Sequence, residues 1–429
     1  MSTRQSDNEN KTNSGVQSEP TATKGQMTVL FFTVFTYLVG FGVVIPIMPI
    51  ISRNFGATSF QVGLVLSAYS LMQFLFSPFW GKLSDRWGRR PILIFCLFGE
   101  TLSYLGLAAA RSYEALVLAR LFAGFFGASI STASAYISDI TPKNQRSKGM
   151  ALIGAAFGLG FLLGPALGAG LAVWGGHISP EPHFDTSFTA MCVAAICFAN
   201  FIFAFKYLKE SLPASVREKA KLGAVAAAHH AQNRFGVLFQ FLKREMLGIL
   251  ILVFFLGSLS MSTMEASLVL FVGDRFNWGL REVSFGFAYI GLIIVLSQGF
   301  LVRKLLPILG EKKMLAAGLV MMILGFGMIT FSYSIAVLAV AMTLVAFGNS
   351  FSNPSTLGSI SLLSSGDEQG AVLGATQGTA SLGRIIGPAL GGFLYGIGVS
   401  PFLLASVMVV VGLVMVVLKF RLLPDSAKH

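Results

Sequence analysis

The chain has 429 residues, of which 54% are hydrophobic and only 12% are charged. An average soluble domain is about 25% charged, so this composition excludes an ordinary soluble globule, and it equally excludes a disordered chain. The net charge is +12, but the basic residues lie between apolar blocks and form no patch that would bind nucleic acid. The composition therefore predicts a polytopic membrane protein.

The apolar residues form twelve segments of membrane-spanning length. They lie near 27–51, 59–80, 91–110, 114–137, 147–174 and 187–208, and then near 246–272, 282–302, 314–332, 334–358, 370–396 and 400–420. We expect an all-α chain with a disordered tail (1–26), a six-helix bundle (27–208), a middle loop (209–245), a second six-helix bundle (246–420) and a short C-terminal tail (421–429).

Lys and Arg are distributed unequally between the two ends of these segments. Twenty-five lie in the two tails, the middle loop and the loops after the second, fourth and eighth segments. Four lie on the other side: Arg53, Arg111, Arg275 and Arg281. Because cytoplasmic loops are enriched in Lys and Arg, we expect both termini and the middle loop to be cytoplasmic.

The loop after the second segment carries an ordered motif, Gly-Lys-Leu-Ser-Asp-Arg-Trp-Gly-Arg-Arg at 81–90. Its glycines permit a tight turn and close approach, and an aspartate beside arginines can exchange ion-pair partners. A plain cytoplasmic loop would explain the arginines but not this order. The motif resembles the loop 2–3 signature of the major facilitator superfamily. That resemblance implies a fold of twelve transmembrane helices in two pseudo-repeated bundles, and a conformational-switch role for Gly81, Asp85, Arg86, Gly88, Arg89 and Arg90.

The fifth and eleventh segments share the pentapeptide Gly-Pro-Ala-Leu-Gly, at 164–168 and 387–391. Equivalent positions in two halves are typical of transporters with parallel repeats. The small residues of the fifth segment resemble the helix 5 motif of exporters in the superfamily, although ordinary close packing would also explain them. They are Gly154, Gly158, Gly164, Pro165 and Gly168.

Four charged residues lie well inside the predicted helices: Glu100, Arg120, Glu265 and Arg384. Intramembrane charges are functional candidates by default. Arg120 resembles the helix 4 arginine of proton-coupled members of the superfamily. We assign proton coupling to Glu265, Glu100 and Arg120, and the sequence leaves open which glutamate carries the proton. A Glu265–Arg384 ion pair, a contact between Glu265 and a substrate cation, and a Glu100–Arg120 pair are the alternatives.

Polar residues recur at helical spacing in the tenth and eleventh segments, which predicts polar walls of a central cavity. Single members of these faces could equally join helices to each other. The resemblance is nearest to drug–proton antiporters of the tetracycline type, and Tyr37 stands where we would align a helix 1 aspartate of those pumps. The expected cavity residues are Tyr37, Gln377, Arg384, Asn349 and Asn353.

These features predict a secondary transporter that exports small amphipathic or aromatic compounds in exchange for protons by alternating access. Transport of a metabolite, sugar or lipid on the same fold is the alternative, and a non-transporting receptor or scaffold is a remoter one. We expect no enzyme activity, cofactor, metal site or nucleic-acid partner, and the proton gradient as energy source. The resemblance implies a protein of the bacterial inner membrane, in contact with lipid, that functions as a monomer.

Overall fold

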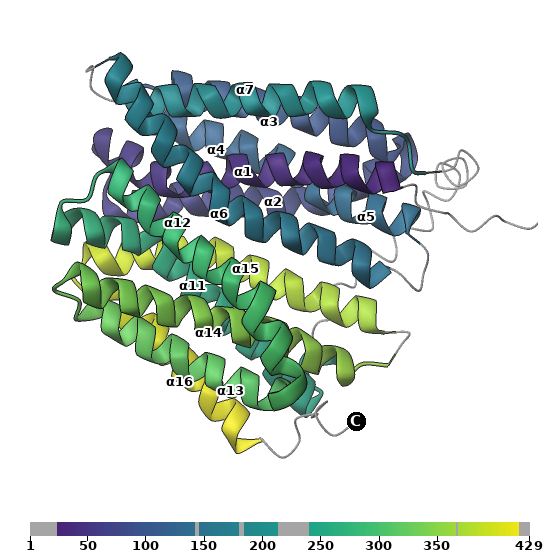
Figure 1. The fold of residues 1–429 in the computed structure, drawn as a ribbon, viewed down its shortest axis with the longest axis vertical. Helices are drawn as coiled ribbons and strands as arrows, with labels where there is room; N and C mark the ends of the chain where they lie inside the picture. The colour runs from purple at the N-terminus through teal and green to yellow at the C-terminus, as the bar shows by residue number, and fades with distance from the viewer. Residues whose placement is uncertain (1–23, 142–145, 180–183, 213–239, 366–367, 420–429) are drawn as a thin grey trace, which may run out of the picture.

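A computed structural model of the protein describes residues 24–141, 146–179, 184–212, 240–365 and 368–419. Within these ranges every regular element is a helix (Figure 1). Most of the predicted middle loop, the C-terminal tail and all but the last three residues of the predicted N-terminal tail lie outside the described residues.

Each of the twelve predicted segments falls on helical residues. The first half contains α1 (Lys24–Asn54), α2 (Ser59–Trp87), α3 (Arg89–Ala109), α4 (Tyr113–Gly127), α5 (Ile130–Ile140), α6 (Arg146–Ile178) and α7 (Phe184–Tyr207). The second half contains α11 (Glu245–Phe276), α12 (Leu280–Leu296), the π-helical turn η3 (Ser297–Val302), α13 (Arg303–Thr330), α14 (Ile335–Leu362), α15 (Gln369–Gly396) and α16 (Pro401–Leu418).

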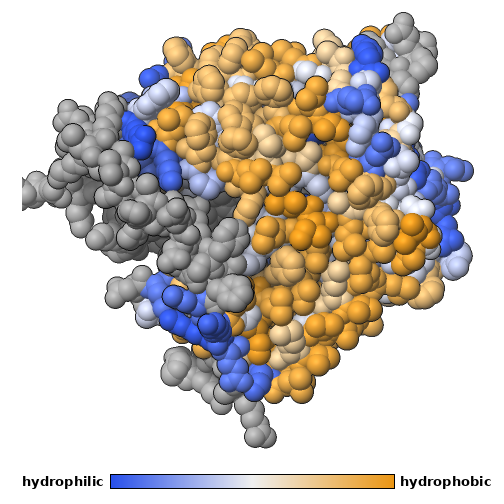
Figure 2. All heavy atoms as spheres, turned by 180° about the vertical axis from the view of Figure 1, so that it is seen from behind, coloured by the Kyte–Doolittle hydropathy of each residue, from blue (hydrophilic) through white to orange (hydrophobic). Residues whose placement is uncertain are grey.

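Nine helical stretches among the described residues are long and apolar enough to cross a membrane. One of them, Leu280–Thr330, contains two predicted segments and bends at Gly310, where φ is 73°. The predicted segments on α6 and α15 are not among the nine stretches. Figure 2 shows a broad apolar band with hydrophilic residues gathered at its two edges. Phe300, Ile308 and Leu418 are 68%, 71% and 76% exposed, as expected where lipid replaces water. The chain is an integral membrane protein.

The segment predicted at 114–137 lies within one candidate membrane span, Tyr113–Ile140, which is interrupted within its length between α4 and α5. α4 ends at Gly127 and α5 begins at Ile130. Ala128 and Ser129 keep right-handed helical dihedrals with ψ near −12°, but the Ser129 N–H donates to the Phe126 carbonyl, three residues back, so the Phe125 carbonyl loses its partner within the helix. The indole N–H of Trp80 on α2 donates to the Phe125 carbonyl at 2.7 Å. A side chain of another helix thus satisfies a carbonyl beside the break.

The repeated pentapeptides occupy equivalent places in the two halves. On α6, a Cβ added to Gly164 would lie 2.7 Å from the Gly42 Cα of α1. On α15, a Cβ added to Gly387 would lie 2.7 Å from the Ser262 Cβ of α11. The helices that carry the pentapeptide therefore pack in the same way: α6 lies closely against α1, and α15 lies closely against α11, through their glycines.

The two halves meet along α2 with α15 and along α6 with α12. Figure 1 shows the purple-to-teal helices of the first half beside the green-to-yellow helices of the second. We call the end of the molecule where α1 ends and α2 begins the Arg53 end. The halves approach closely there: a Cβ on Gly63 of α2 would overlap the Pro388 carbonyl of α15. The opposite end, where α2 ends and α3 begins, is called the Arg89 end.

Candidate functional site

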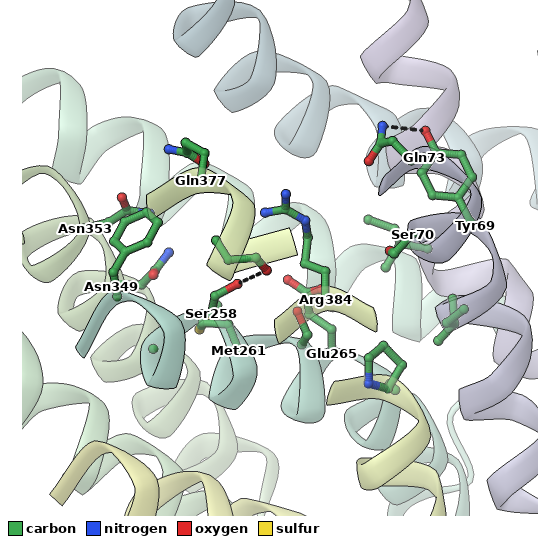
Figure 3. A pocket seen from close by; sticks show the side chains of 18 of the residues that line it. Tyr69, Ser70, Gln73, Ser258, Met261, Glu265, Asn349, Asn353, Gln377 and Arg384 are labelled. Carbon is green, nitrogen blue, oxygen red and sulfur yellow. Dashed lines mark hydrogen bonds between the residues drawn. The ribbon is translucent and has the colours of Figure 1, made fainter. Parts of the chain in front are cut away.

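A cavity of about 560 Å³ lies between the two halves. Helices α1, α2, α4 and α5 line it from the first half, and α11, α13, α14 and α15 line it from the second (Figure 3). A central cavity at the interface between repeats is where transporters built from repeats bind their substrates.

All five residues predicted for the cavity line it: Tyr37, Asn349, Asn353, Gln377 and Arg384. Glu265 and Arg120 line it as well, whereas Glu100 is not part of its wall. Sequence reasoning missed the contribution of α2, which supplies Leu66, Tyr69, Ser70 and Gln73.

The wall formed by the second half is polar and charged. The Arg384 guanidinium donates to the Ser381 hydroxyl at 3.0 Å, and the Ser258 hydroxyl of α11 donates to the Ala380 carbonyl of α15 at 2.9 Å. Glu265 makes no hydrogen bond with any described residue. The Glu265–Arg384 ion pair considered from the sequence is absent from the described part of the chain.

The wall formed by the first half is aromatic and hydrogen-bonded. The hydroxyls of Tyr37 and Tyr69 lie 2.5 Å apart. Tyr37 also donates to the Gly127 carbonyl at 3.2 Å, and the Gln73 amide donates to the same carbonyl at 3.2 Å. The Arg120 guanidinium lies 4.6 Å from the centre of the Tyr69 ring. Side chains of α1 and α2 thus hold the end of α4 at the cavity surface.

Glu100 and Arg120 are buried within the first half, with 2% and 4% of their surface exposed. The structure gives no ion pair between these two described residues, so the Glu100–Arg120 pair that the sequence left open is not formed in this state. Within the described ranges of the chain, Glu100 Oε1 and Arg120 Nε also lack hydrogen-bond partners. Buried polar atoms without partners are uncommon in proteins, which keeps both residues candidates for a functional role.

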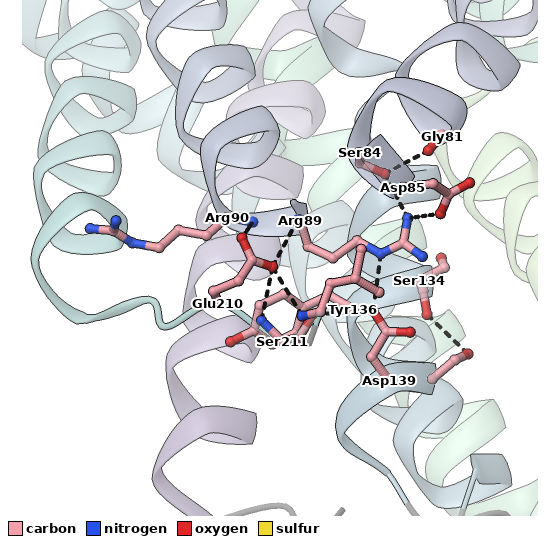
Figure 4. A network of polar contacts seen from close by, with 12 residues as sticks. Gly81, Ser84, Asp85, Arg89, Arg90, Ser134, Tyr136, Asp139, Glu210 and Ser211 are labelled. Carbon is pink, nitrogen blue, oxygen red and sulfur yellow. Dashed lines mark hydrogen bonds and ion pairs between the residues drawn. The ribbon is translucent and has the colours of Figure 1, made fainter. Parts of the chain in front are cut away.

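The loop 2–3 motif forms a network at the Arg89 end (Figure 4). Arg89 contacts the Asp85 carboxylate at 2.6 Å and the Asp139 carboxylate of α5 at 3.0 Å. Gly88 has a φ of 107°, a conformation that favours glycine, and it turns the chain from α2 into α3. A Cβ on Gly81 would meet nothing within 4 Å, and Arg86 is exposed.

Glu210, which the sequence did not single out, caps the beginning of α3. Its carboxylate accepts the backbone N–H groups of Arg89 and Arg90 at 2.9 and 3.2 Å. A carboxylate is favourable at a helix N-terminus because the backbone N–H groups there lack partners within the helix. The Arg90 side chain donates to the carbonyls of Leu208 and Phe205 at 2.7 and 2.8 Å. The motif is thus tied to the end of α7 as well as to α5.

The predicted exporter motif lies on α6, with Pro165 inside the helix. Gly164 and Gly168 face α1, and a Cβ on Gly168 would lie 3.2 Å from Val43. The surroundings of Gly154 and Gly158 lie outside the described side chains. A Cβ added to Gly160, which was not part of the prediction, would lie 2.7 Å from the Leu38 side chain of α1.

The Major Facilitator Superfamily sequence profile matches residues 30–309 and 299–429. Tetracycline resistance protein, class B, of Escherichia coli is 30% identical over 359 residues, which span 83% of this chain and 85% of that protein. Multidrug resistance protein 2 of Bacillus subtilis is 30% identical over 392 residues, which span 90% of this chain and 92% of that protein.

Solved structures resemble the chain over most of its length. The crystal structure of the human organic anion transporter MFSD10 (TETRAN) gives a TM-score of 0.65 at 26% identity, covering 91% of this chain and 99% of that one. A bacterial homolog of the human lysosomal transporter Spinster, in an inward-facing and occupied conformation, gives a TM-score of 0.72 at 13% identity, covering 92% and 96%. At that identity the second likeness concerns the fold alone.

Proposed function

Because the chain belongs to the major facilitator superfamily, and is therefore a membrane transporter and not an enzyme, we propose that it exports small amphipathic or aromatic compounds in exchange for protons. The resistance proteins among its relatives support export of drug-like compounds. The cavity between the two halves supports alternating access, in which the halves rock about a central site.

The observation that carries the proposal is the position of Glu265. Its carboxylate lines the cavity, is partly exposed there and has no hydrogen-bonded or ion-paired partner among the described residues. A carboxylate with this freedom can bind a proton when the cavity faces one side and release it when the cavity faces the other. Glu100 is the second candidate, because it is buried behind the cavity beside Arg120.

The distribution of basic residues supports an orientation for this cycle. The four Lys and Arg residues of the sparse side lie at or near the Arg53 end, and the loop 2–3 motif lies at the Arg89 end. The positive-inside rule then makes the Arg89 end cytoplasmic. The contacts of Gly63 with Pro388 close the halves at the opposite, outer end, which fits a state that loads substrate from the cytoplasm. By resemblance the membrane is the bacterial inner membrane.

Reconstituted protein provides the test. Proteoliposomes with an imposed proton gradient should move tetracycline or a cationic dye against the direction of proton flow, and Glu265→Gln should abolish this transport. Glu100→Gln tests the other carboxylate, and Glu114→Gln, at an exposed position on α4, is the matched control. The proposal would be contradicted if wild-type vesicles transported none of the drugs, or if gradient-driven transport were unchanged in both Glu265→Gln and Glu100→Gln. Transport of a sugar or metabolite instead would favour the alternative substrate class.

A further inference from the structure

Two opposite charges face the same cavity from neighbouring helices of the second half, Glu265 on α11 and Arg384 on α15 (Figure 3). Among the described residues, the Arg384 guanidinium makes one hydrogen bond, to the Ser381 hydroxyl, and Glu265 makes none. Neither charge is neutralised by an ion pair within the described chain. The cavity therefore offers an anionic and a cationic group, each open to a ligand.

The register of the two helices separates these charges along the cavity. The Ser258 hydroxyl bonds to the Ala380 carbonyl, and Gly387 lies against Ser262. From these two contacts, Glu265 lies three to six residues farther towards the Arg53 end than Arg384, which corresponds to about 5–9 Å of helix. This offset leaves room between the two side chains for a ligand group that carries both charges.

Close packing holds this spacing fixed. A Cβ on Gly383, the residue before Arg384, would lie 2.9 Å from the Leu259 backbone nitrogen of α11. A Cβ on Gly391 would lie 2.6 Å from the Thr263 carbonyl of the same helix. The two backbones touch above and below the charges, which favours movement of α11 and α15 as one unit. The pair is a preorganised feature of a rigid wall.

The opposite wall is aromatic. Tyr37, Phe41 and Tyr69 line the cavity from the first half, and the rings of Phe41 and Tyr69 have their centres 5.1 Å apart. The third charged residue of the cavity, Arg120, lies over the Tyr69 ring. The two walls therefore differ in chemistry: three of the four aromatic side chains in the lining belong to the first half, and the separated pair of opposite charges belongs to the second.

We propose that Glu265 and Arg384 together bind the head group of a zwitterionic amphipathic compound, whose aromatic body lies against Tyr37, Phe41 and Tyr69. Glu265 binds the ammonium and Arg384 binds the carboxylate. A ligand with one charge leaves the other side chain unpaired in a partly desolvated site, and that costs affinity. The inference rests on the proposed function for its physiological meaning, because the ammonium and the transported proton then compete for one carboxylate.

A matched set of four fluorescent ligands tests the charge requirement. Nε-dansyl-lysine is zwitterionic, its methyl ester is a cation, its Nα-acetyl derivative is an anion, and the Nα-acetyl methyl ester is neutral. Equilibrium binding is measured with the full chain in nanodiscs without any gradient, and empty nanodiscs correct for partition into lipid. We expect the zwitterion to bind about tenfold more tightly than either singly charged ligand.

The variants separate the two contacts. Glu265→Gln should remove the preference for the zwitterion over the anionic ligand and leave its preference over the cationic ester. Arg384→Gln should remove the preference for the zwitterion over the cationic ester and leave its preference over the anionic ligand. Glu265→Asp and Arg384→Lys keep the charges and should retain part of both preferences, whereas Arg281→Gln, on α12 and away from the cavity lining, should change neither.

Three outcomes would overturn the proposal: no binding of the zwitterion, affinities of all four ligands within about twofold of one another, or equal losses for all ligands in either single variant. The outcome is independent of the transport test. Charge-selective binding without proton-driven transport would leave the site standing and refute the exchange mechanism. Proton-driven transport without charge selectivity would refute the zwitterion site and leave the exchange mechanism standing.

Discussion

An ion pair at the Arg53 end joins the two halves, and removing it should favour a state that is open there. Arg53 at the end of α1 makes two hydrogen bonds to the Asp274 carboxylate of α11, one of them between Nη2 and Oδ2 at 3.0 Å. The Tyr395 hydroxyl of α15 donates to the same carboxylate oxygen at 2.7 Å. Asp274→Asn keeps the size of the side chain and removes the charge that holds Arg53.

The expected size of the effect follows from the exposure of the pair. The Arg53 and Asp274 side chains are 35% and 47% exposed, so water and salt screen much of their attraction. Exposed ion pairs contribute about 0.2–1 kcal/mol, and the two-point geometry and the Tyr395 hydroxyl place this pair at the upper end. A loss of about 1 kcal/mol changes the ratio of open to closed molecules about fivefold.

Distances between spin labels on the two halves measure this ratio. Labels at Asn54 and Val399, which are exposed at the Arg53 end of each half, should show a larger population of long distances in Asp274→Asn. Arg53→Gln should give a similar shift, and the double variant should add little to either, because both changes remove one interaction.

Arg275→Gln provides the matched control for charge at the same end. Arg275 lies 5.4 Å and 4.3 Å from the ring centres of Phe271 and Tyr333, all within the second half, so its loss should leave the distances unchanged. Equal shifts in Arg275→Gln, or fully additive shifts in the double variant of Arg53 and Asp274, would refute the reasoning.

Three further changes have expected outcomes. Gly63→Ala should lower the melting temperature, because the added Cβ would overlap the Pro388 carbonyl and overpacking typically costs about 1–3 kcal/mol. Gly378→Ala is the control: a Cβ there would have no atom within 4 Å, so the change should be neutral or stabilising. Equal effects of the two changes would contradict the packing argument. Trp80→Phe should lower the free energy of unfolding by about 1–3 kcal/mol, because it leaves the Phe125 carbonyl without its donor. An unchanged melting temperature would show that the break after α4 does not need this hydrogen bond. The hydrogen bond from Arg244 lowers the pKa of Glu368, so the stabilisation from this pair is complete above the ordinary carboxyl pKa and is lost as pH falls through the lowered pKa. The melting temperatures of wild type and Glu368→Gln should therefore differ at neutral pH and converge once the pH is below the lowered pKa, and a constant difference would exclude this origin.

The sequence predicted the features that depend on a single helix. The polar faces that include Asn349, Asn353 and Gln377 lie on the cavity because a helical period of 3.6 residues puts them on one side, whatever the helix packs against. The apolar segments were predictable because the thickness of the membrane sets their length.

Features that depend on several helices were not predictable. Hydrogen bonds to the Phe125 and Gly127 carbonyls come from α1 and α2, and they stabilise a break that the apolar pattern of 114–137 concealed. Nothing local indicates that Arg53 meets Asp274. A signal did exist for Glu210: α3 begins after Gly88 without a capping side chain of its own, so an acceptor from elsewhere was required.

The repeat and the cavity show where the two halves agree and where they differ. Glycines of the repeated pentapeptide join α6 to α1 in the first half and α15 to α11 in the second. The first half nevertheless contributes most of the cavity's aromatic rings, and the second contributes Glu265 and Arg384. Since both charges belong to one packed pair of helices, rocking of the halves leaves their spacing unchanged and moves only the aromatic wall relative to them. At equal protonation of Glu265, the preference for a ligand's charges should then be the same in both states of the cycle, and the affinity for its aromatic body should differ between them. Substrate release on the outer side therefore requires the protein to weaken the aromatic contacts and to protonate the carboxylate.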